Sequence, residues 1–165
     1  MPLSKSERLI LANQYKILES LEPSERDYAK AIEALENGYE LAIDDLFSSI
    51  FEGLSSEQCR FVIKSMAMYD ALQRSYKSLA DKKSIEARKV KFPGFDGNNE
   101  TELMSYAQFV VEREERFTYL ETGDDGFNSH TEMSERYRAM LAVWHSIEEP
   151  YDLSSDQMAR ILDAR

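Results

Sequence analysis

Glycine and proline are few in this 165-residue sequence and gather in a small number of places, which constrains the fold more than any other feature. Both residues interrupt helices, so the uninterrupted stretches between them predict helices. The longest such stretch covers residues 54–92. The interrupting positions are Pro2, Pro23, Gly38, Gly53, Pro93, Gly94, Gly97, Gly123, Gly126 and Pro150.

Three places carry the capping-box pattern, in which a serine and a Glu or Gln three residues later exchange hydrogen bonds with the backbone at a helix start. The pairs are Ser4 with Glu7, Ser55 with Gln58, and Ser154 with Gln157. The first predicts a helix over residues 5–21, where Ile10, Ile17 and Leu21 recur at helical spacing. The second predicts a long helix over about residues 56–80 with one apolar face, and the third predicts a helix near the C-terminus.

Weaker start signals predict the remaining helices, because Ser, Thr, Asp and Asn are the preferred caps. The expected caps are Ser24 with Asp27 for a helix ending at Gly38, Asp44 for a short helix ending at Gly53, Asn99 with Glu102, and Thr131 for a helix ending before Pro150. Residues 81–99 predict a short irregular segment with a helical turn at 84–87, an extended piece at 88–92 and then a tight turn. The sequence therefore predicts an all-α fold: a single multihelical domain of six to seven helices around the long central helix.

The composition is that of a folded globular protein, with 42% hydrophobic and 31% charged residues. A single cysteine, Cys59, cannot form an internal disulfide or a cysteine-based zinc cage. No run of about eighteen apolar residues and no signal-peptide core is present, so we expect a cytoplasmic protein without membrane association. The net charge of −11 disfavours nucleic acid at long range.

A basic segment at residues 82–91 departs from this acidic background. It carries five cations against Glu86, a net charge of +4: Lys82, Lys83, Arg88, Lys89 and Lys91. Such a run is most often solvated surface, but it is also the one local reason to consider nucleic acid or another anionic ligand. A helix-turn-helix-like region at residues 44–70 would accompany nucleic-acid binding, although its expected recognition helix lacks a basic face.

The stretch GDDGFNSHTEM, residues 123–133, crowds polar side chains around His130. A calcium loop needs oxygen ligands at alternating positions, with glycine at the sixth and glutamate at the twelfth. Counting from Asp124, the third position is Gly126, so the template fails. The two glycines instead favour a turn ahead of the helix that Thr131 starts. No metal ion and no cofactor are expected.

Enzymatic chemistry has few candidates in this sequence. Cys59 lies in the first turn of the long helix, where its hydrophobic-staple position favours a buried role over that of a nucleophile. No phosphate-binding loop, dinucleotide fingerprint, zinc-protease helix or nucleophile elbow is present. A site becomes conceivable only if the two glycine-rich turns meet, and it would then contain Arg88, Asp96, Asn128 and His145.

Four separated phrases resemble, in order and spacing, the YfbU family of bacterial proteins. They are RLILANQYK (8–16), CRFVIKSMAMYDAL (59–72), SIEARKVKFPGFD (84–96) and GFNSHTEMSERYRAMLAVWH (126–145). The resemblance covers essentially the whole chain and implies one cytoplasmic YfbU-like helical domain over residues 1–165, with no catalytic residues to carry over. It does not require histidine at position 130, but it includes Arg88, Phe92, Gly94, Phe95, Asp96, Trp144 and His145.

Taken together, these features predict a non-enzymatic interaction or regulatory domain that associates with itself, since tyrosine and methionine, which are abundant here, are favoured at contact surfaces. The expected partners are further copies of the chain, in a dimer or higher oligomer, and another protein. Nucleic-acid or anionic-ligand binding is the alternative, and an enzyme of unknown reaction is the second alternative. The candidate interaction or ligand residues are Lys82, Lys83, Arg88, Lys89, Lys91, Asp96, Asn128, Trp144 and His145.

Overall fold

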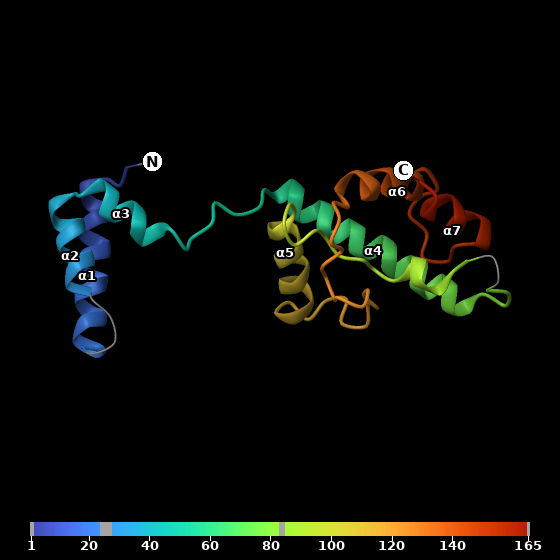
Figure 1. Ribbon diagram of the computed structural model, residues 1–165, viewed down its shortest axis with the longest axis horizontal. Coiled ribbons are helices and arrows are strands. Elements are labelled where there is room, and N and C mark those ends of the chain that lie inside the picture. Colours follow the sequence, from blue (N-terminus) through green and yellow to red (C-terminus); the bar gives the residue numbers. More distant parts are fainter. Residues whose placement is uncertain (1, 24–27, 83–84, 165) are drawn as a thin grey trace. The chain divides into compact units, whose positions relative to one another are not determined.

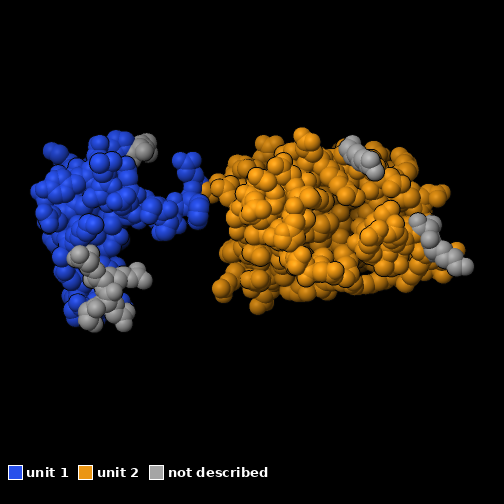
Figure 2. Space-filling view, viewed as in Figure 1, with its two compact units in different colours: residues 1–52 blue, residues 53–165 orange. Residues whose placement is uncertain are grey.

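A computed structural model describes residues 2–23, 28–82 and 85–164 of the chain (Figure 1). Over these ranges it contains seven α-helices and one 3-10 helix, and no strand. The predicted all-α fold is therefore confirmed. The chain divides into two compact units, which we call the N-terminal unit, residues 1–52, and the C-terminal unit, residues 53–165 (Figure 2). One domain over residues 1–165 stays a prediction.

The N-terminal unit contains three helices around a small core. They are α1 (Lys5–Leu21), α2 (Tyr28–Asn37) and α3 (Glu40–Phe47). The capping box predicted at the start of α1 is confirmed, because the Ser4 hydroxyl accepts from the backbone N–H of Glu7 and the Glu7 carboxylate accepts from the N–H of Ser4. The caps expected at Ser24 and Asp27 lie outside the described residues. The core of the unit contains Ala12, Ala34, Leu35 and Ile43.

The third helix begins earlier than predicted. It starts at Glu40 rather than at Asp44, because α2 ends in a tight glycine turn. Gly38 has a φ of +73°, which glycine adopts without the strain that a side chain would cause. The N–H of this glycine donates to the carbonyl of Ala34 at 2.9 Å. Because of this turn, α3 starts only two residues after Gly38, and Ile43 of α3 lies in the core.

The connection between α3 and α4 (Ser56–Ser78) does not fit a helix-turn-helix motif. That motif joins its helices by about three or four residues, whereas α3 ends at Phe47 and residues 48–55 follow before α4. The first helix of such a motif, expected at residues 44–51, is thus wrong at both ends, since α3 covers Glu40–Phe47. Its residues 48–51 belong to the connection.

In the C-terminal unit, α4 is the central element, as predicted for the long helix. It packs against α5 (Thr101–Glu112), α6 (Ser134–Ser146) and the 3-10 helix η1 (Ala87–Val90), and α6 also packs against α7 (Ser155–Leu162). The capping boxes predicted at the starts of α4 and α7 are both present. One face of α4 is fully buried over the middle of the helix, including Val62, Met66, Tyr69 and Leu72.

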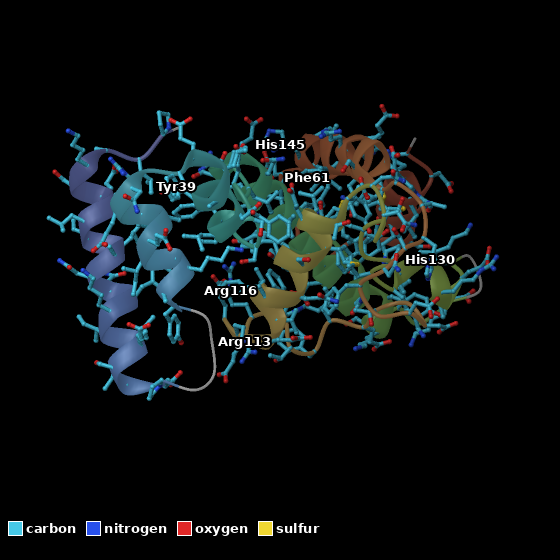
Figure 3. The ribbon with its side chains drawn as sticks, turned by 60° about the vertical axis from the view of Figure 1, so that its left-hand side comes forward. Tyr39, Phe61, Arg113, Arg116, His130 and His145 are labelled. Atoms are coloured by element: carbon cyan, nitrogen blue, oxygen red, sulfur yellow. The ribbon has the colours of Figure 1, made fainter. Side chains whose placement is uncertain are left out.

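Aromatic rings fill the core beside α4. The fully buried ring of Phe92 lies with its centroid 5.3 Å from that of Tyr69 and 5.8 Å from that of Tyr137. On α4, Phe61 (labelled in Figure 3) packs edge-on at 6.2 Å against Phe95. Burial raises the pKa of the Tyr137 hydroxyl well above its ordinary value. That neutral hydroxyl donates a hydrogen bond of 2.7 Å to a backbone carbonyl, so the cluster has no unpaired polar group at this point.

Part of the segment at residues 81–99 differs from the prediction. The helical turn expected at 84–87 is wrong, since the 3-10 helix covers 87–90. The extended piece expected at 88–92 is limited to residues 91–92, because the 3-10 helix includes residues 88–90. The side chain of Val90 is buried and its carbonyl faces α4, so tertiary contacts fix where this turn forms.

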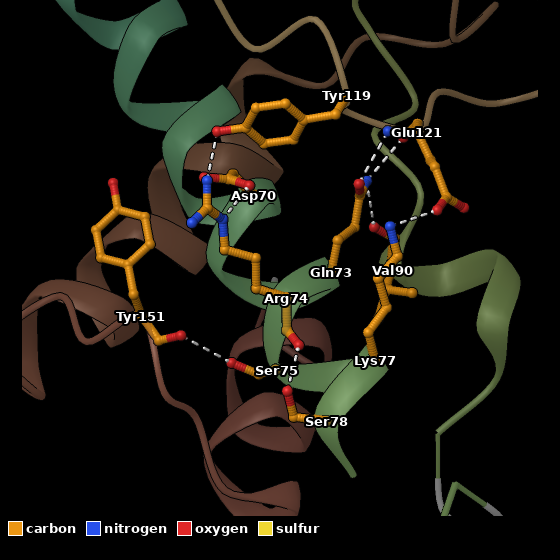
Figure 4. Close-up of polar contacts among 10 residues, drawn as sticks. All are labelled: Asp70, Gln73, Arg74, Ser75, Lys77, Ser78, Val90, Tyr119, Glu121 and Tyr151. Atoms are coloured by element: carbon orange, nitrogen blue, oxygen red, sulfur yellow. Dashed lines mark hydrogen bonds and ion pairs between the residues drawn. The ribbon is translucent and has the colours of Figure 1, made fainter.

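Gln73, buried on α4, holds two irregular segments in place (Figure 4). Its Nε2 donates to the carbonyl of Val90 at 3.0 Å and to that of Glu121 at 2.7 Å. Its Oε1 accepts from the N–H of Glu121 at 2.9 Å. One side chain therefore pairs three backbone groups that belong to segments far apart in the sequence.

Ser75 makes a second clamp of this kind from the same helix. Its hydroxyl donates to the carbonyl of Tyr151 at 3.3 Å and accepts from the N–H of Leu153 at 2.8 Å. The connection between α6 and α7 is fixed to α4 by these two bonds.

Replacing Gln73 by leucine should lower the free energy of unfolding by about 3 kcal/mol, because the carbonyl of Val90 and the N–H of Glu121 lose their hydrogen-bond partner inside the protein. Urea unfolding followed by circular dichroism measures this change. The control is Lys77→Gln, one turn along α4, where the side chain is exposed and the ion pair with Glu121 contributes little. A Gln73→Leu protein as stable as the Lys77→Gln control would contradict the clamp.

Candidate functional site

The two glycine-rich turns meet. Residues 92–97 and 122–129 run side by side, with the N–H of Phe95 donating to the carbonyl of Phe127 at 2.8 Å. Gly94 has a φ of +88°, and a Cβ there would lie 1.8 Å from the carbonyl oxygen of Phe127. No side chain fits in that space, so the close approach of the two turns depends on this glycine.

Asp96 and Asn128 are brought together, but their polar atoms are used within the turns. The carboxylate of Asp96 accepts from the N–H of Asn98 at 3.2 Å and from the side chain of Asn99 at 2.6 Å. These bonds lower the pKa of Asp96, the one from Asn98 most. Asn128 Oδ1 accepts from the N–H groups of Gly97 and His130, each at 3.0 Å. Both side chains therefore stabilise backbone turns.

Arg88 and His145 have other partners. Arg88 pairs with Glu86 at 2.7 Å, and His145 Nδ1 lies 3.3 Å from the Glu149 carboxylate. Over the described residues, no contact joins Arg88 or His145 to Asp96 or Asn128. The structure thus assembles only two of the four residues that a site at the glycine-rich turns would need.

The stretch at 123–133 is a turn, as predicted. The N–H of Gly126 donates to the carbonyl of Gly123 at 3.2 Å, and Gly126 has a φ of +65°. His130 lies 3.1 Å from the Asp125 carboxylate and far from His145 (Figure 3). In the described part of the chain, no three His, Cys, Asp or Glu side chains are placed to hold a metal ion.

The helix after this turn starts later than predicted and is capped by a distant residue. Thr131 does not cap it; α6 begins at Ser134, and the side chain of its own cap residue, Met133, makes no capping hydrogen bond. The carboxylate of Glu100 accepts instead from the N–H groups of Met133 at 2.9 Å and Ser134 at 2.8 Å. It also accepts from the N–H of Asp96 at 3.0 Å, so this buried carboxylate joins the starts of α5 and α6.

Sequence reasoning missed Glu100. Asn99 is the residue predicted to cap α5, and this is wrong, because the Asn99 amide donates to Asp96 and α5 begins at Thr101 without a side-chain cap. The one local signal for Glu100 is an acid at a helix start, which is common there. Its main partner, Ser134, lies 34 residues away in the sequence.

Acids lie beside three of the five cations of the basic segment. Glu86 pairs with both Arg88 and Lys89, and Lys91 lies 3.9 Å from the carboxylate of Asp124. The ammonium of Lys82 lies over the ring of Tyr76 at 5.2 Å, while Lys83 is outside the described residues. Binding of nucleic acid or another anion by residues 82–91 stays a prediction.

Trp144 and His145, neighbours in the sequence, have opposite surroundings. Trp144 is buried, and its indole N–H donates to the carbonyl of Pro150 at 3.1 Å, so it serves the core. His145 is exposed beside a shallow groove of about 330 Å³ between α4 and α6, whose charged lining includes Lys64, Arg138 and Glu149. The pKa of Glu149 is lowered, mainly by the hydrogen bond from Lys64. The groove's own carboxylate therefore pairs with Lys64, while the guanidinium of Arg138 lies over the ring of Phe61 at 5.2 Å.

The exposed apolar side chains are distributed very unevenly. Over the described residues, twelve large hydrophobic side chains are exposed, and nine of them belong to the N-terminal unit. We call these nine the N-terminal apolar surface: Leu9, Ile10, Ile17, Leu18, Leu21, Tyr39, Leu41, Ile50 and Phe51. Single exposed apolar residues are ordinary, but a concentration of them marks an interaction surface.

The architecture defines an all-α protein built from two compact helical units, with its polar residues engaged in caps and turns. Within the described ranges, none of the helices combines the length and the apolar character needed to cross a bilayer. The sequence model of the YfbU domain family matches residues 1–164, and the chain belongs to the YfbU family. The resemblance found in the sequence is thereby confirmed.

Replacing Glu100 by glutamine should cost about 2 kcal/mol of stability at pH 7, because an amide cannot accept three N–H groups as a carboxylate does. Burial raises the pKa of Glu100, but the hydrogen bonds from Ser134, Met133 and Asp96 outweigh it and hold the pKa below its ordinary value. The stabilisation is therefore complete above the unfolded pKa of about 4.3 and is lost as the pH falls through the lower folded pKa.

Urea unfolding between pH 7 and pH 3 tests this dependence. The difference in stability between wild type and Glu100→Gln should shrink as the solution is acidified below about pH 4.3. Glu102→Gln, an exposed acid in the first turn of α5, is the matched control and should change little. A difference that stays constant across the whole pH range would refute this role of the carboxylate.

Proposed function

We propose that this protein is a non-enzymatic interaction protein that associates with itself through its N-terminal unit. The observation that carries the proposal is the N-terminal apolar surface: of the twelve large hydrophobic side chains exposed among the described residues, nine lie within the 52-residue N-terminal unit. The engagement of Asp96, Asn128 and Glu100 in turns and caps favours an interaction role over catalysis.

The small core of the N-terminal unit supports the need for a partner. Its buried hydrophobic residues, over the part that is described, are Ala12, Tyr28, Ala31, Ala34, Leu35 and Ile43. Three of these six are alanines, which bury little apolar area. A unit of about 50 residues with so little buried surface is marginal by itself, since hydrophobic stabilisation scales with buried area. Covering the N-terminal apolar surface would supply the missing burial.

The exposed apolar residues of the C-terminal unit already have partners. Phe109 stacks on Tyr106 with ring centroids 6.2 Å apart, and Tyr119 lies under Arg74 at 5.1 Å. The ring of Tyr151 packs against Trp144 at 6.0 Å. These three belong to different elements and are not gathered as the nine are. A second copy of the chain offers an apolar surface of matching size.

The extent of the surface is sufficient for a stable dimer. A typical specific interface buries about 800 Å² on each partner and has an apolar centre with a polar rim. Nine large side chains that are 41–84% exposed supply apolar residues from which such a centre can be formed. A dimer built from one surface on both copies is isologous, which is the commonest arrangement among soluble oligomers. A cytoplasmic location stays a prediction beside this proposal.

Light scattering coupled to gel filtration at micromolar protein should give a mass of at least twice the 19.1 kDa of the chain. Because association stabilises the N-terminal unit, its thermal unfolding should also shift to higher temperature as the protein concentration rises. A 19.1 kDa species with a melting temperature independent of concentration would rule out self-association.

A further inference from the structure

The outer side of α1 carries a seam with the spacing of a coiled coil. Ile10, Gln14, Ile17 and Leu21 follow one another at intervals of four, three and four residues. At about 100° per residue these positions fall within roughly 60° of one another around the helix, so they form one stripe. Ile10, Ile17 and Leu21 are 57%, 58% and 71% exposed.

The N-terminal unit uses the other side of α1 for its own packing. Ala12 is buried in the core, and the guanidinium of Arg8 donates to the carbonyl of Leu35 at 3.0 Å. The ring of Tyr15 packs at 6.1 Å from that of Tyr28. The seam therefore takes no part in the internal packing of its unit, although it is as apolar as a core-facing stripe.

The residues that flank the seam are uncharged. In a chain with 31% charged residues, the exposed positions beside it are Ser6, Asn13, Leu18 and Ser20. The one acid near its start, Glu7, is engaged in the capping box. Charged residues are depleted at the centres of protein interfaces, since burying an unpaired charge is costly. This composition fits a contact between helices and does not fit a solvated face.

The polar member of the seam favours a second copy as the occupant. Gln14 has both donors and an acceptor, so its amide can pair with the same amide of another copy. A polar residue at a single core position of a helix pair fixes the register of the partners at some cost in stability. A partner with a wholly apolar face would leave this amide without a hydrogen bond.

We propose that the seam of α1 packs against the same seam of a second copy across a two-fold axis, with Gln14 near the axis. This inference rests on the proposed self-association and names the surface that performs it. Helices with heptad spacing pack side by side at crossing angles of about 20°. The contact adds an apolar layer between the N-terminal units of two copies, beside the small core that each unit has by itself.

The double substitution Ile10→Glu with Ile17→Glu tests the contact. It places two charges per copy in the seam and should weaken association at least ~100-fold, so that light scattering gives 19.1 kDa at micromolar protein. Leu41→Glu, at an 84% exposed position of the same unit, and Phe109→Glu, in the C-terminal unit, should keep the mass of the wild type. Far-UV circular dichroism checks that each variant retains its helices.

Cysteine cross-linking gives a second test that introduces no charge. Cys59 is the only cysteine, so a Cys59→Ser background removes the native thiol. In that background, Gln14→Cys should form a disulfide-linked dimer on oxidation at micromolar protein, because a residue near a two-fold axis meets its own copy. Glu33→Cys should not form such a dimer. Glu33 is exposed on the side of α2 that faces away from the core of the unit.

The outcomes separate the inference from the proposed function. A monomeric wild type rejects self-association and this contact with it. An oligomeric wild type whose Ile10→Glu, Ile17→Glu variant keeps its mass, or whose Gln14→Cys variant cross-links no better than Glu33→Cys, rejects the α1 contact alone. Monomeric Ile10→Glu, Ile17→Glu protein that retains its helices, together with cross-linking through Gln14→Cys, supports it.

Discussion

The amide of Gln73 holds the C-terminal unit together in a way that no helix packing could replace. Over the described residues this fold has no sheet to pair the whole backbone of its connections, so buried polar groups that find no backbone partner must pair with side chains. Gln73 has two donors and one well-placed acceptor, and these meet the carbonyl of Val90 and both backbone groups of Glu121. The segment that follows Val90 then carries Phe92 into the aromatic core, and the segment around Glu121 brings the second glycine-rich turn beside it.

The same device recurs at other joints of this unit. Ser75 fixes the connection between α6 and α7, and Glu100 joins the starts of α5 and α6. Each is a buried polar side chain on a helix or at a helix start that pairs backbone groups from elsewhere in the chain. Buried polar groups that are fully paired give a unit one defined arrangement, since any alternative packing leaves them unpaired. The residues that looked suited to chemistry are therefore engaged in structure.

The two units differ in how much they bury. The C-terminal unit has large fully buried side chains such as Trp144, Tyr69 and Tyr137, whereas the N-terminal unit relies mainly on alanines and Leu35. The N-terminal unit also leaves more large apolar side chains exposed than the C-terminal unit, although it is much shorter. A unit with little internal burial and much exposed apolar area gains stability when it is covered, so folding and association are coupled in it. This asymmetry is the physical basis for assigning the interaction role to residues 1–52.

The sequence by itself determined the features that depend on near neighbours. The capping boxes at Ser4, Ser55 and Ser154 and the extent of α1 and α4 follow from hydrogen bonds and side-chain spacing within a few residues, and they were predicted correctly. Family membership was readable for the same reason, because it rests on local phrases.

Only the tertiary structure decided the rest. The cap of α6 comes from Glu100 and the pairing of Glu121 comes from Gln73, partners 34 and 48 residues away that leave no local signal. Helical spacing located Ile10, Ile17 and Leu21 on one side of α1, but spacing gives only the relative positions of residues on a helix. Which side is covered depends on what packs against it, and in this chain α2 packs on the other one.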